Sequence, residues 1–168
     1  MKGQISFVEY LAALSIFITS VIFIAYQLIY FVPQYLKEVN DQRVRINAYQ
    51  ISELLINDPG NPANWYASPQ TIRLGLSNET LNITNYVSLT KIGAFNTLCN
   101  VPGGYSNVKN YMGASENFTI VLYDLTNPGP PLINCGPPIM FSSLTNTSIS
   151  RIITIDSGDI GELNVQSG

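Results

Sequence analysis

Histidine is absent from this chain of 168 residues. Without it there is no imidazole to act as a general base, to complete a Ser-His-Asp triad or to bind a metal. The sequence also contains no P-loop, no G-x-G-x-x-G fingerprint and no C-x-x-C pair. We therefore expect no enzyme and no cofactor; an enzymatic interpretation would need a carboxylate pair such as Asp156 and Asp159.

Charge is also scarce. Only 11% of the residues are charged, the net charge is −3 and the isoelectric point is about 4.7. The few cations beyond Arg45 are scattered: Arg73, Lys91, Lys109 and Arg151. Nucleic-acid binding depends on clustered lysines and arginines that contact phosphates. We therefore expect no nucleic-acid partner.

Cysteine occurs only twice, at Cys99 and Cys135. An isolated pair in an extracytoplasmic domain predicts a single disulfide, and the alternative is two buried free thiols. Cys99 as a nucleophile would lack a histidine base, which favours a structural role.

The most prominent feature present is a long apolar segment near the amino terminus. No Asp, Glu, Lys or Arg occurs between Glu9 and Lys37, and roughly 18 to 25 apolar residues suffice for a helix to cross a bilayer. A cleavable secretory signal is shorter and ends at a small-residue site, which is missing here. This segment predicts a transmembrane helix in contact with the lipid bilayer.

The residues in front of this segment resemble a known signal. Lys2-Gly3-Gln4, then Ser6, Glu9 and the apolar helix, resemble the class III signal peptide of archaeal type IV pilin-like proteins. The resemblance implies that a prepilin-type signal peptidase cuts between Gly3 and Gln4 on the cytoplasmic side and leaves the helix on the mature chain. An uncleaved signal-anchor helix is the alternative.

Glu9 is the assembly residue that this resemblance implies. Its carboxylate would pair with the new amino terminus of the same or a neighbouring subunit inside a filament, where either charge alone is costly. The family places this glutamate at the fifth mature position, whereas Glu9 would be the sixth. In the alternative, Glu9 lies in the headgroup region of the membrane.

Potential glycosylation sites suggest which side of the membrane the rest of the chain occupies. Four N-x-S/T sequons follow the helix, and each predicts surface exposure. An Asn- and Thr-rich surface also generates such triplets by chance. With the leader and the cysteine pair, they predict an extracellular domain and a cytoplasmic amino terminus. The sequons begin at Asn78, Asn82, Asn117 and Asn146.

The remaining residues predict one α+β domain. Apolar residues at positions 44, 48, 51 and 55 form one helical stripe, and Pro33 is expected to kink or interrupt the helix before it. Helices are predicted over 89–98, with Ser88 as N-cap, and over 105–112. Strands are predicted over 71–76, 118–125, 132–135, 139–142, 148–155 and 161–165, and they favour an antiparallel sheet.

We therefore divide the chain into a leader (1–3), a transmembrane or filament-core helix (4–33), a helix extension packing on the domain (34–57) and an extracellular α+β domain (58–168). The segments 59–65 and 72–76, and those around 88–92 and 105–109, also resemble pilin-like surface proteins.

Near the carboxyl terminus, Asp156, Asp159 and Glu162 flank two glycines. This pattern is typical of a solvated acidic turn; a weak Ca²⁺ site is the alternative, and it is not an EF-hand loop.

The resemblance implies a membrane-anchored subunit of a type IV pilus-like filament used in adhesion, at the cell surface or in the pilus. Its partners would be other pilin-like subunits and the assembly platform. The alternative is a monomeric binding domain that uses the helix only as a tether.

Overall fold

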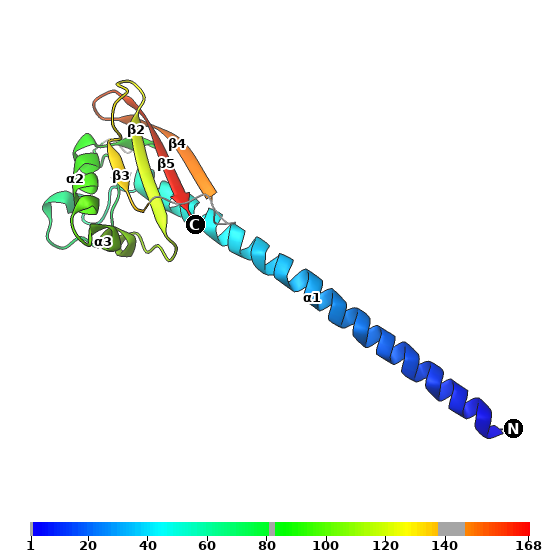
Figure 1. Cartoon of the computed structure of the whole chain (residues 1–168). Helices are drawn as coiled ribbons and strands as arrows, with labels where there is room; N and C mark the ends of the chain where they lie inside the picture. Colours follow the sequence, from blue (N-terminus) through cyan, green and yellow to red (C-terminus); the bar gives the residue numbers. More distant parts are fainter. Residues whose placement is uncertain (1, 81–82, 138–146) are drawn as a thin grey trace. The chain divides into compact units, whose positions relative to one another are not determined.

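A computed structural model describes residues 2–80, 83–137 and 147–168, with the backbone alone for residues 2–6. The chain forms two compact units, Met1–Asn40 and Asp41–Gly168. The first helix, α1 (Lys2–Asn57), belongs to both units (Figure 1). Each unit is described below by itself.

The first unit is the amino-terminal part of α1. Pro33 was expected to kink or interrupt this helix, but the helical backbone runs through Pro33 without a break. The prediction of an interruption is therefore wrong. A proline removes one backbone donor from a helix interior, and helices rich in apolar residues tolerate such a loss when the rest of the ladder is kept.

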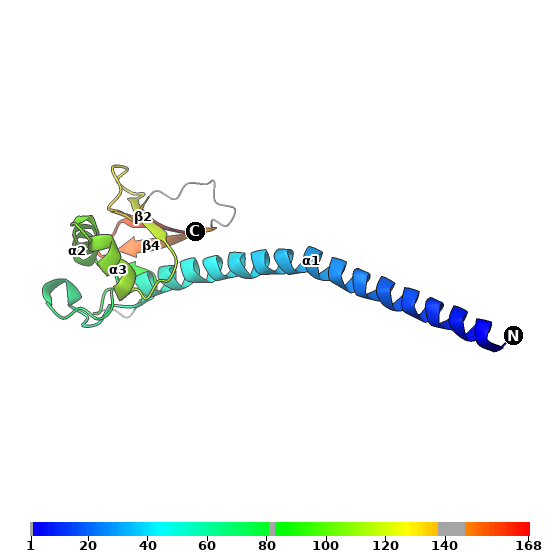
Figure 2. The same cartoon turned by 60° about the horizontal axis from the view of Figure 1, so that its bottom comes forward.

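The second unit contains the end of α1, two further helices and a sheet (Figure 2). The helices are α2 (Leu89–Asn100) and α3 (Gly104–Tyr111), preceded by the short 3₁₀ helix η1 (Trp65–Ala67). Both predicted helices are confirmed. The strands are β1 (Tyr86–Val87), β2 (Phe118–Asp124), β3 (Ile133–Cys135), β4 (Thr147–Ile155) and β5 (Ile160–Ser167).

The sheet has the order β1-β4-β5-β2-β3. Strand β5 is central and pairs antiparallel with both β4 and β2, so that Val165 lies opposite Ile149 on one side and Ile120 on the other. β3 is also antiparallel to β2, but the two-residue β1 runs parallel to β4. The predicted α+β class is thus confirmed, with a mixed sheet whose main strands are antiparallel.

One predicted strand is absent. Residues 71–76 form no strand; Arg73 makes only an isolated bridge with Asn61. Leu74 and Leu76 are nevertheless fully buried. The backbone at Gly75 packs so closely on the preceding turn that a Cβ there would lie 2.0 Å from the carbonyl oxygen of Asp58. Ile72 is exposed, whereas Leu74, Gly75 and Leu76 are buried in succession, so the segment packs as a loop and not as one face of a strand. The predicted strand over 139–142 lies outside the described residues.

The core forms where the sheet faces the end of α1. The predicted stripe is buried, since Val44 and Ile51 are 3% exposed and Ala48 and Leu55 are 0% exposed. Ala48, Ile51 and Leu55 belong to a cluster with the inward residues of the strands and with Phe95 of α2. A helix of modest propensity is stabilised in this way mainly by the burial of one apolar face.

Candidate functional site

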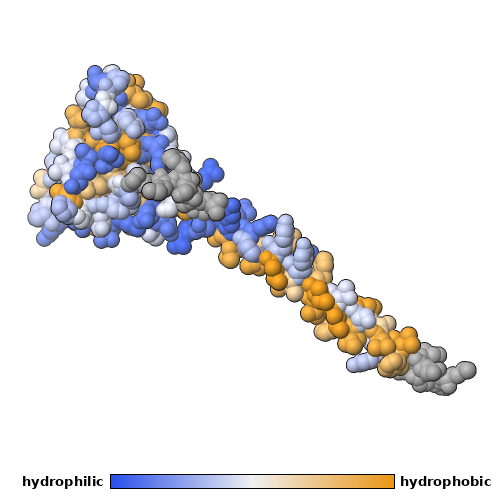
Figure 3. Space-filling model, in the orientation of Figure 1, coloured by the Kyte–Doolittle hydropathy of each residue, from blue (hydrophilic) through white to orange (hydrophobic). Residues whose placement is uncertain are grey.

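The candidate functional surface of the first unit is an apolar helix whose side chains are not buried. Within the described residues Phe7–Asn57, one stretch of 18 residues is strongly apolar, and none of its residues is buried. Ile16 and Ile29, for example, are 69% and 76% exposed. Figure 3 shows apolar residues over much of this helix. The segment is therefore long and apolar enough to cross a membrane.

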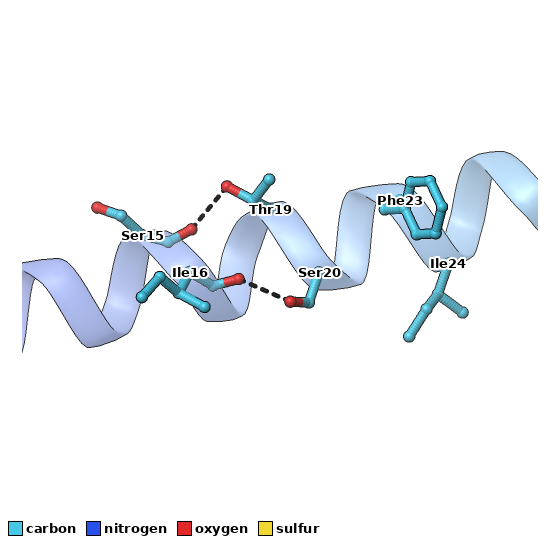
Figure 4. A pocket seen from close by; sticks show the side chains of 6 residues that line it. All are labelled: Ser15, Ile16, Thr19, Ser20, Phe23 and Ile24. Atoms are coloured by element: carbon cyan, nitrogen blue, oxygen red, sulfur yellow. Dashed lines mark hydrogen bonds between the residues drawn. The ribbon is translucent and has the colours of Figure 1, made fainter.

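The hydroxyl groups within this segment have partners inside the helix. Ser15, Thr19 and Ser20 donate hydrogen bonds to the carbonyl oxygens of Leu11, Ser15 and Ile16, four residues earlier, at 2.8–2.9 Å. Figure 4 shows the bonds of Thr19 and Ser20. A hydroxyl bonded to its own helix no longer needs water. These polar residues therefore do not prevent the segment from entering a hydrocarbon environment.

Tyrosines occur at both ends of the apolar segment. Tyr10 lies beside Glu9, and at the other end the rings of Tyr26 and Tyr30 stack at 6.3 Å, with Phe31 edge-on to Tyr30 at 5.4 Å. Twenty residues separate Tyr10 from Tyr30, which is about 30 Å along a helix. That distance matches the hydrocarbon thickness of a bilayer, and tyrosines are enriched at its two interfaces.

The predicted processing residues lie at the start of α1. Gly3 and Gln4 have helical backbone, and Glu9 is exposed one to two turns later. Neither cleavage after Gly3 nor pairing of Glu9 with an amino terminus is tested by this geometry, so both stay predictions.

The two cysteines are joined as predicted. A disulfide links Cys99, near the end of α2, to Cys135 in β3, with the Cα atoms 5.7 Å apart. Both residues are buried. The bond closes a sequence separation of 36 residues, which in the chain-entropy model contributes on the order of 3 to 4 kcal/mol to stability.

The same helix also covers the outer edge of β3. Asn96 accepts a hydrogen bond from the backbone N–H of Asn134 at 3.2 Å, and the Asn100 amide donates to the carbonyl of Asn134 at 3.5 Å. Satisfied edge groups are not available for pairing with another chain.

The described sequons differ in their surroundings. Asn78 is half-buried, and its side-chain oxygen accepts hydrogen bonds from the backbone N–H and the hydroxyl of Thr80. Asn117 is exposed, but Thr119 is 7% exposed and donates its hydroxyl to the carbonyl of Pro137. Asn82 and Asn146 lie outside the described residues. Glycosylation itself stays a prediction.

The acidic turn holds loops together. Asp156 accepts a hydrogen bond from the N–H of Leu89 at 2.9 Å, at the start of α2, whereas the side chain of the predicted N-cap Ser88 makes no capping bond. A carboxylate at this position also complements the helix dipole.

The second acidic residue of the turn, Asp159, accepts hydrogen bonds from Ser157 and Asn127 at 2.6 and 3.1 Å. No group of three or more potential metal ligands occurs among the residues that the structure describes.

Two polar clusters were not anticipated from the sequence. Glu53 of α1 pairs with Arg151 of β4, whose guanidinium lies 4.9 Å from the ring centre of Tyr49. Burial alone would raise the pKa of Glu53, but hydrogen bonds from Tyr49 and Arg151 outweigh it and lower the pKa. No sequence pattern connects residues 98 positions apart.

The second cluster surrounds Lys91, which is only 2% exposed. Its ammonium donates to the carbonyl oxygens of Pro59 and Ser77 at 2.8 and 2.9 Å. Burial lowers the pKa of Lys91, and the nearby carboxylates of Glu79 and Asp58 partly oppose this effect. One sequence feature could have indicated that Lys91 is buried. Lys91 lies in helix α2 next to Ile92, an apolar residue that is also buried.

Fold and surface together define an α+β protein with one apolar amino-terminal helix and a disulfide-linked domain. The chain is 30% identical to an uncharacterized protein of Archaeoglobus fulgidus over an alignment 170 positions long, which covers 89% of this chain and 87% of that protein. The chain therefore belongs to the same family as this archaeal protein. No protein-family model matches the chain, and no solved structure matches it.

Proposed function

We propose that this protein is a membrane-anchored, pilin-like surface protein that assembles into a type IV pilus-like filament used in adhesion. The observation that carries the proposal is a single helix with two kinds of surface. Its first part is apolar on every side and not buried, and its last part forms the core of a domain. Such a helix is suited to anchor in a bilayer and then to pack against helices of other subunits.

The orientation of the chain across the membrane follows from the same proposal. Cleavage between Gly3 and Gln4 by a prepilin-type signal peptidase takes place on the cytoplasmic side, and the disulfide-linked domain lies outside the cell, where disulfides persist. The Tyr10 and Tyr30 rings would then mark the two membrane interfaces.

The experiment is a charge-removing substitution at Glu9 in the native cell. Glu9→Gln keeps the shape of the side chain but leaves the new ammonium unpaired in an apolar filament core, so we expect processed monomer to accumulate in the membrane and labelled fibres to disappear. Glu9→Asp should give an intermediate amount. Glu38→Gln, which removes an exposed carboxylate later on the same helix, is the matched control and should leave fibres unchanged.

Three measurements read this experiment. Electron microscopy with gold-labelled antibody to the domain locates the protein, intact mass gives the amino terminus, and membrane fractionation gives the monomer. If cells that make the unchanged protein show uniform labelling of the membrane and no fibres, this would favour the alternative of a monomeric domain that uses the helix only as a tether. A mature chain that starts at Ile5 would restore Glu9 to the fifth position, and a chain that keeps Met1 would exclude processing. Normal amounts of fibre with Glu9→Gln would exclude the pairing role.

A further inference from the structure

The domain has a concave surface formed by residues that follow helix α1 in the sequence. A groove of about 490 Å³ lies between the loop 65–71 and the helices α2 and α3. Trp65 and Tyr66 line it from η1, Thr97 from α2 and Tyr111 from the end of α3. All of its lining residues belong to the second unit and are described.

The aromatic side of this groove is held in place from behind. Trp65 is 3% exposed, and its indole N–H donates to the carbonyl of Gly75 at 2.8 Å. Gly60, with φ +89°, packs against the indole so closely that a Cβ there would lie 2.3 Å from Trp65 Cδ1. Tyr66 stands edge-on to the indole, with the ring centres 6.3 Å apart, and is 44% exposed. A surface that is ordered in advance loses little entropy when a ligand binds.

The polar groups of the groove are neutral hydroxyls with unused hydrogen-bonding capacity. None of the described residues that line the groove is charged. Thr97 and Thr71 donate their hydroxyls to backbone carbonyls, so their oxygens can still accept, whereas the Ser68 oxygen accepts from the N–H of Gln70 and can still donate. The tyrosines add phenolic hydroxyls that both donate and accept.

These features select one chemical class of ligand. An ionised ligand would lose water without gaining a charged partner, and a purely apolar ligand would leave the desolvated hydroxyls without partners. A sugar ring has an apolar C–H face that can pack on a tyrosine ring and hydroxyls that both donate and accept. We propose that this groove binds a neutral saccharide.

This inference goes beyond the proposed filament, because the groove is complete within one chain. The test therefore uses the full chain as a monomer in lipid nanodiscs prepared without maltoside detergents. Trp65 is the sole tryptophan, so tryptophan fluorescence reports on the groove directly. Cellobiose, chitobiose, maltose and mannobiose are the probes, each titrated to saturation or to solubility.

We expect a saturable fluorescence change with at least one of these probes. Tyr66→Ala should weaken binding about tenfold, in line with the loss of about 1.4 kcal/mol of stacking. The matched control is Tyr123→Ala on β2, since Tyr123 is also 44% exposed but does not line the groove; it should bind as the unchanged chain does.

A second variant guards against an effect of Tyr66→Ala on folding. Thr97→Gln places a longer neutral side chain in the groove from the exposed face of α2 and should weaken binding at least as much as Tyr66→Ala does, with an unchanged circular dichroism spectrum. The absence of saturation with every saccharide would overturn the proposal. So would equal affinities for the Tyr66→Ala and unchanged chains, or saturation by n-hexanol with none by the saccharides.

Discussion

Between Phe7 and Asn40, helix α1 is dominated by apolar side chains and none of its residues is buried, whereas from Asp41 to Asn57 the same helix places one stripe in a protein core. In the first part apolar residues occur on every side of the helix. In the second part they alternate with polar residues, so that a single face is apolar. A helix that is apolar all round requires an apolar environment on all sides, but one with a single apolar face needs only a sheet beside it.

The two parts of helix α1 therefore need different surroundings, although they belong to one continuous helix. Val44, Ala48, Ile51 and Leu55 are buried, and the last three pack in one core with residues of the chain's own sheet. The apolar part has no buried residue between Phe7 and Asn40 and is long and apolar enough to cross a membrane. Substitutions of the same kind should therefore have different consequences in the two parts.

The largest contrast is expected from leucine truncation. Leu55→Ala should destabilise the domain by about 2–5 kcal/mol, because Leu55 is fully buried and its truncation leaves a cavity. Leu28→Ala, the same change at a residue that is 59% exposed, should leave the free energy of domain unfolding unchanged. Denaturant unfolding of the full chain in nanodiscs, followed by Trp65 fluorescence, measures both. Equal losses of stability would remove the distinction between the two parts of the helix.

A charged substitution should give the opposite result, with a large effect in the apolar part of helix α1 and none in the second part. Ile22→Arg places a guanidinium in the middle of the apolar segment, and insertion should become less favourable by about 2.5–3.5 kcal/mol. Gln42→Arg, at an exposed position in the second unit, should leave insertion intact. The carbonate-resistant membrane fraction of each variant is the measurement. A full membrane fraction for Ile22→Arg would contradict the membrane-spanning role.

A smaller effect is expected from the ion pair at the carboxyl-terminal part of α1. Glu53→Gln should cost about 0.5–1 kcal/mol at neutral pH, because Glu53 and Arg151 are partly exposed. The folded-state pKa of Glu53 lies below its ordinary value of 4.5, so its contribution is present above pH 4.5 and is lost as the pH falls through the folded-state pKa. Glu53→Gln should flatten this part of the acid titration of stability. Glu38→Gln, in the first unit, should leave the titration as it is.

The smallest effect should appear at alkaline pH, where Lys91 titrates. Its folded-state pKa lies below the ordinary value of 10.5, so the unfolded chain binds more protons between the two values and stability should rise with pH in that window. Burial raises the pKa of Tyr105 above 10, opposed in part by the hydrogen bond with the N–H of Phe118, so stability should fall again above pH 10.

Lys91→Met should abolish the rise, and Lys37→Met, which removes an exposed amine from the first unit, should keep it. Unfolding free energies at a series of pH values between 7 and 10.5 measure the slope. A rise that persists in Lys91→Met would assign it to another group.

Much of the fold could be predicted from local patterns. The strands β2, β4 and β5 and the helices α2 and α3 have strong local signals, in the form of β-branched runs and of helical spacing with a nearby stop. The strand expected over 71–76 failed because Leu74, Gly75 and Leu76 are buried in succession in a loop that packs on the Asp58–Gly60 turn, and Arg73 makes only an isolated bridge. Pro33 was expected to kink or interrupt the helix, and the interruption does not occur because one lost hydrogen bond does not end a helix that is long on both sides.

The candidate sites also differ in whether the sequence indicated them. The apolar helix and the two cysteines were evident from composition and count. The groove beside Trp65 was not, because its lining comes from η1, α2 and α3, and no periodicity within one segment indicates a surface that three segments share.

The sequence by itself determined the membrane-length helix, the α+β class and the pair of cysteines available for a disulfide. These depend on the identity of residues that are near one another in the chain, or on there being only one possible pairing. Tertiary structure alone decided that Lys91 is buried against two carbonyl groups, that Asp156 rather than Ser88 caps α2, and that Glu53 meets Arg151. Each of these contacts joins residues at least 14 positions apart, and distance along the chain carries no information about distance in space until the core has packed.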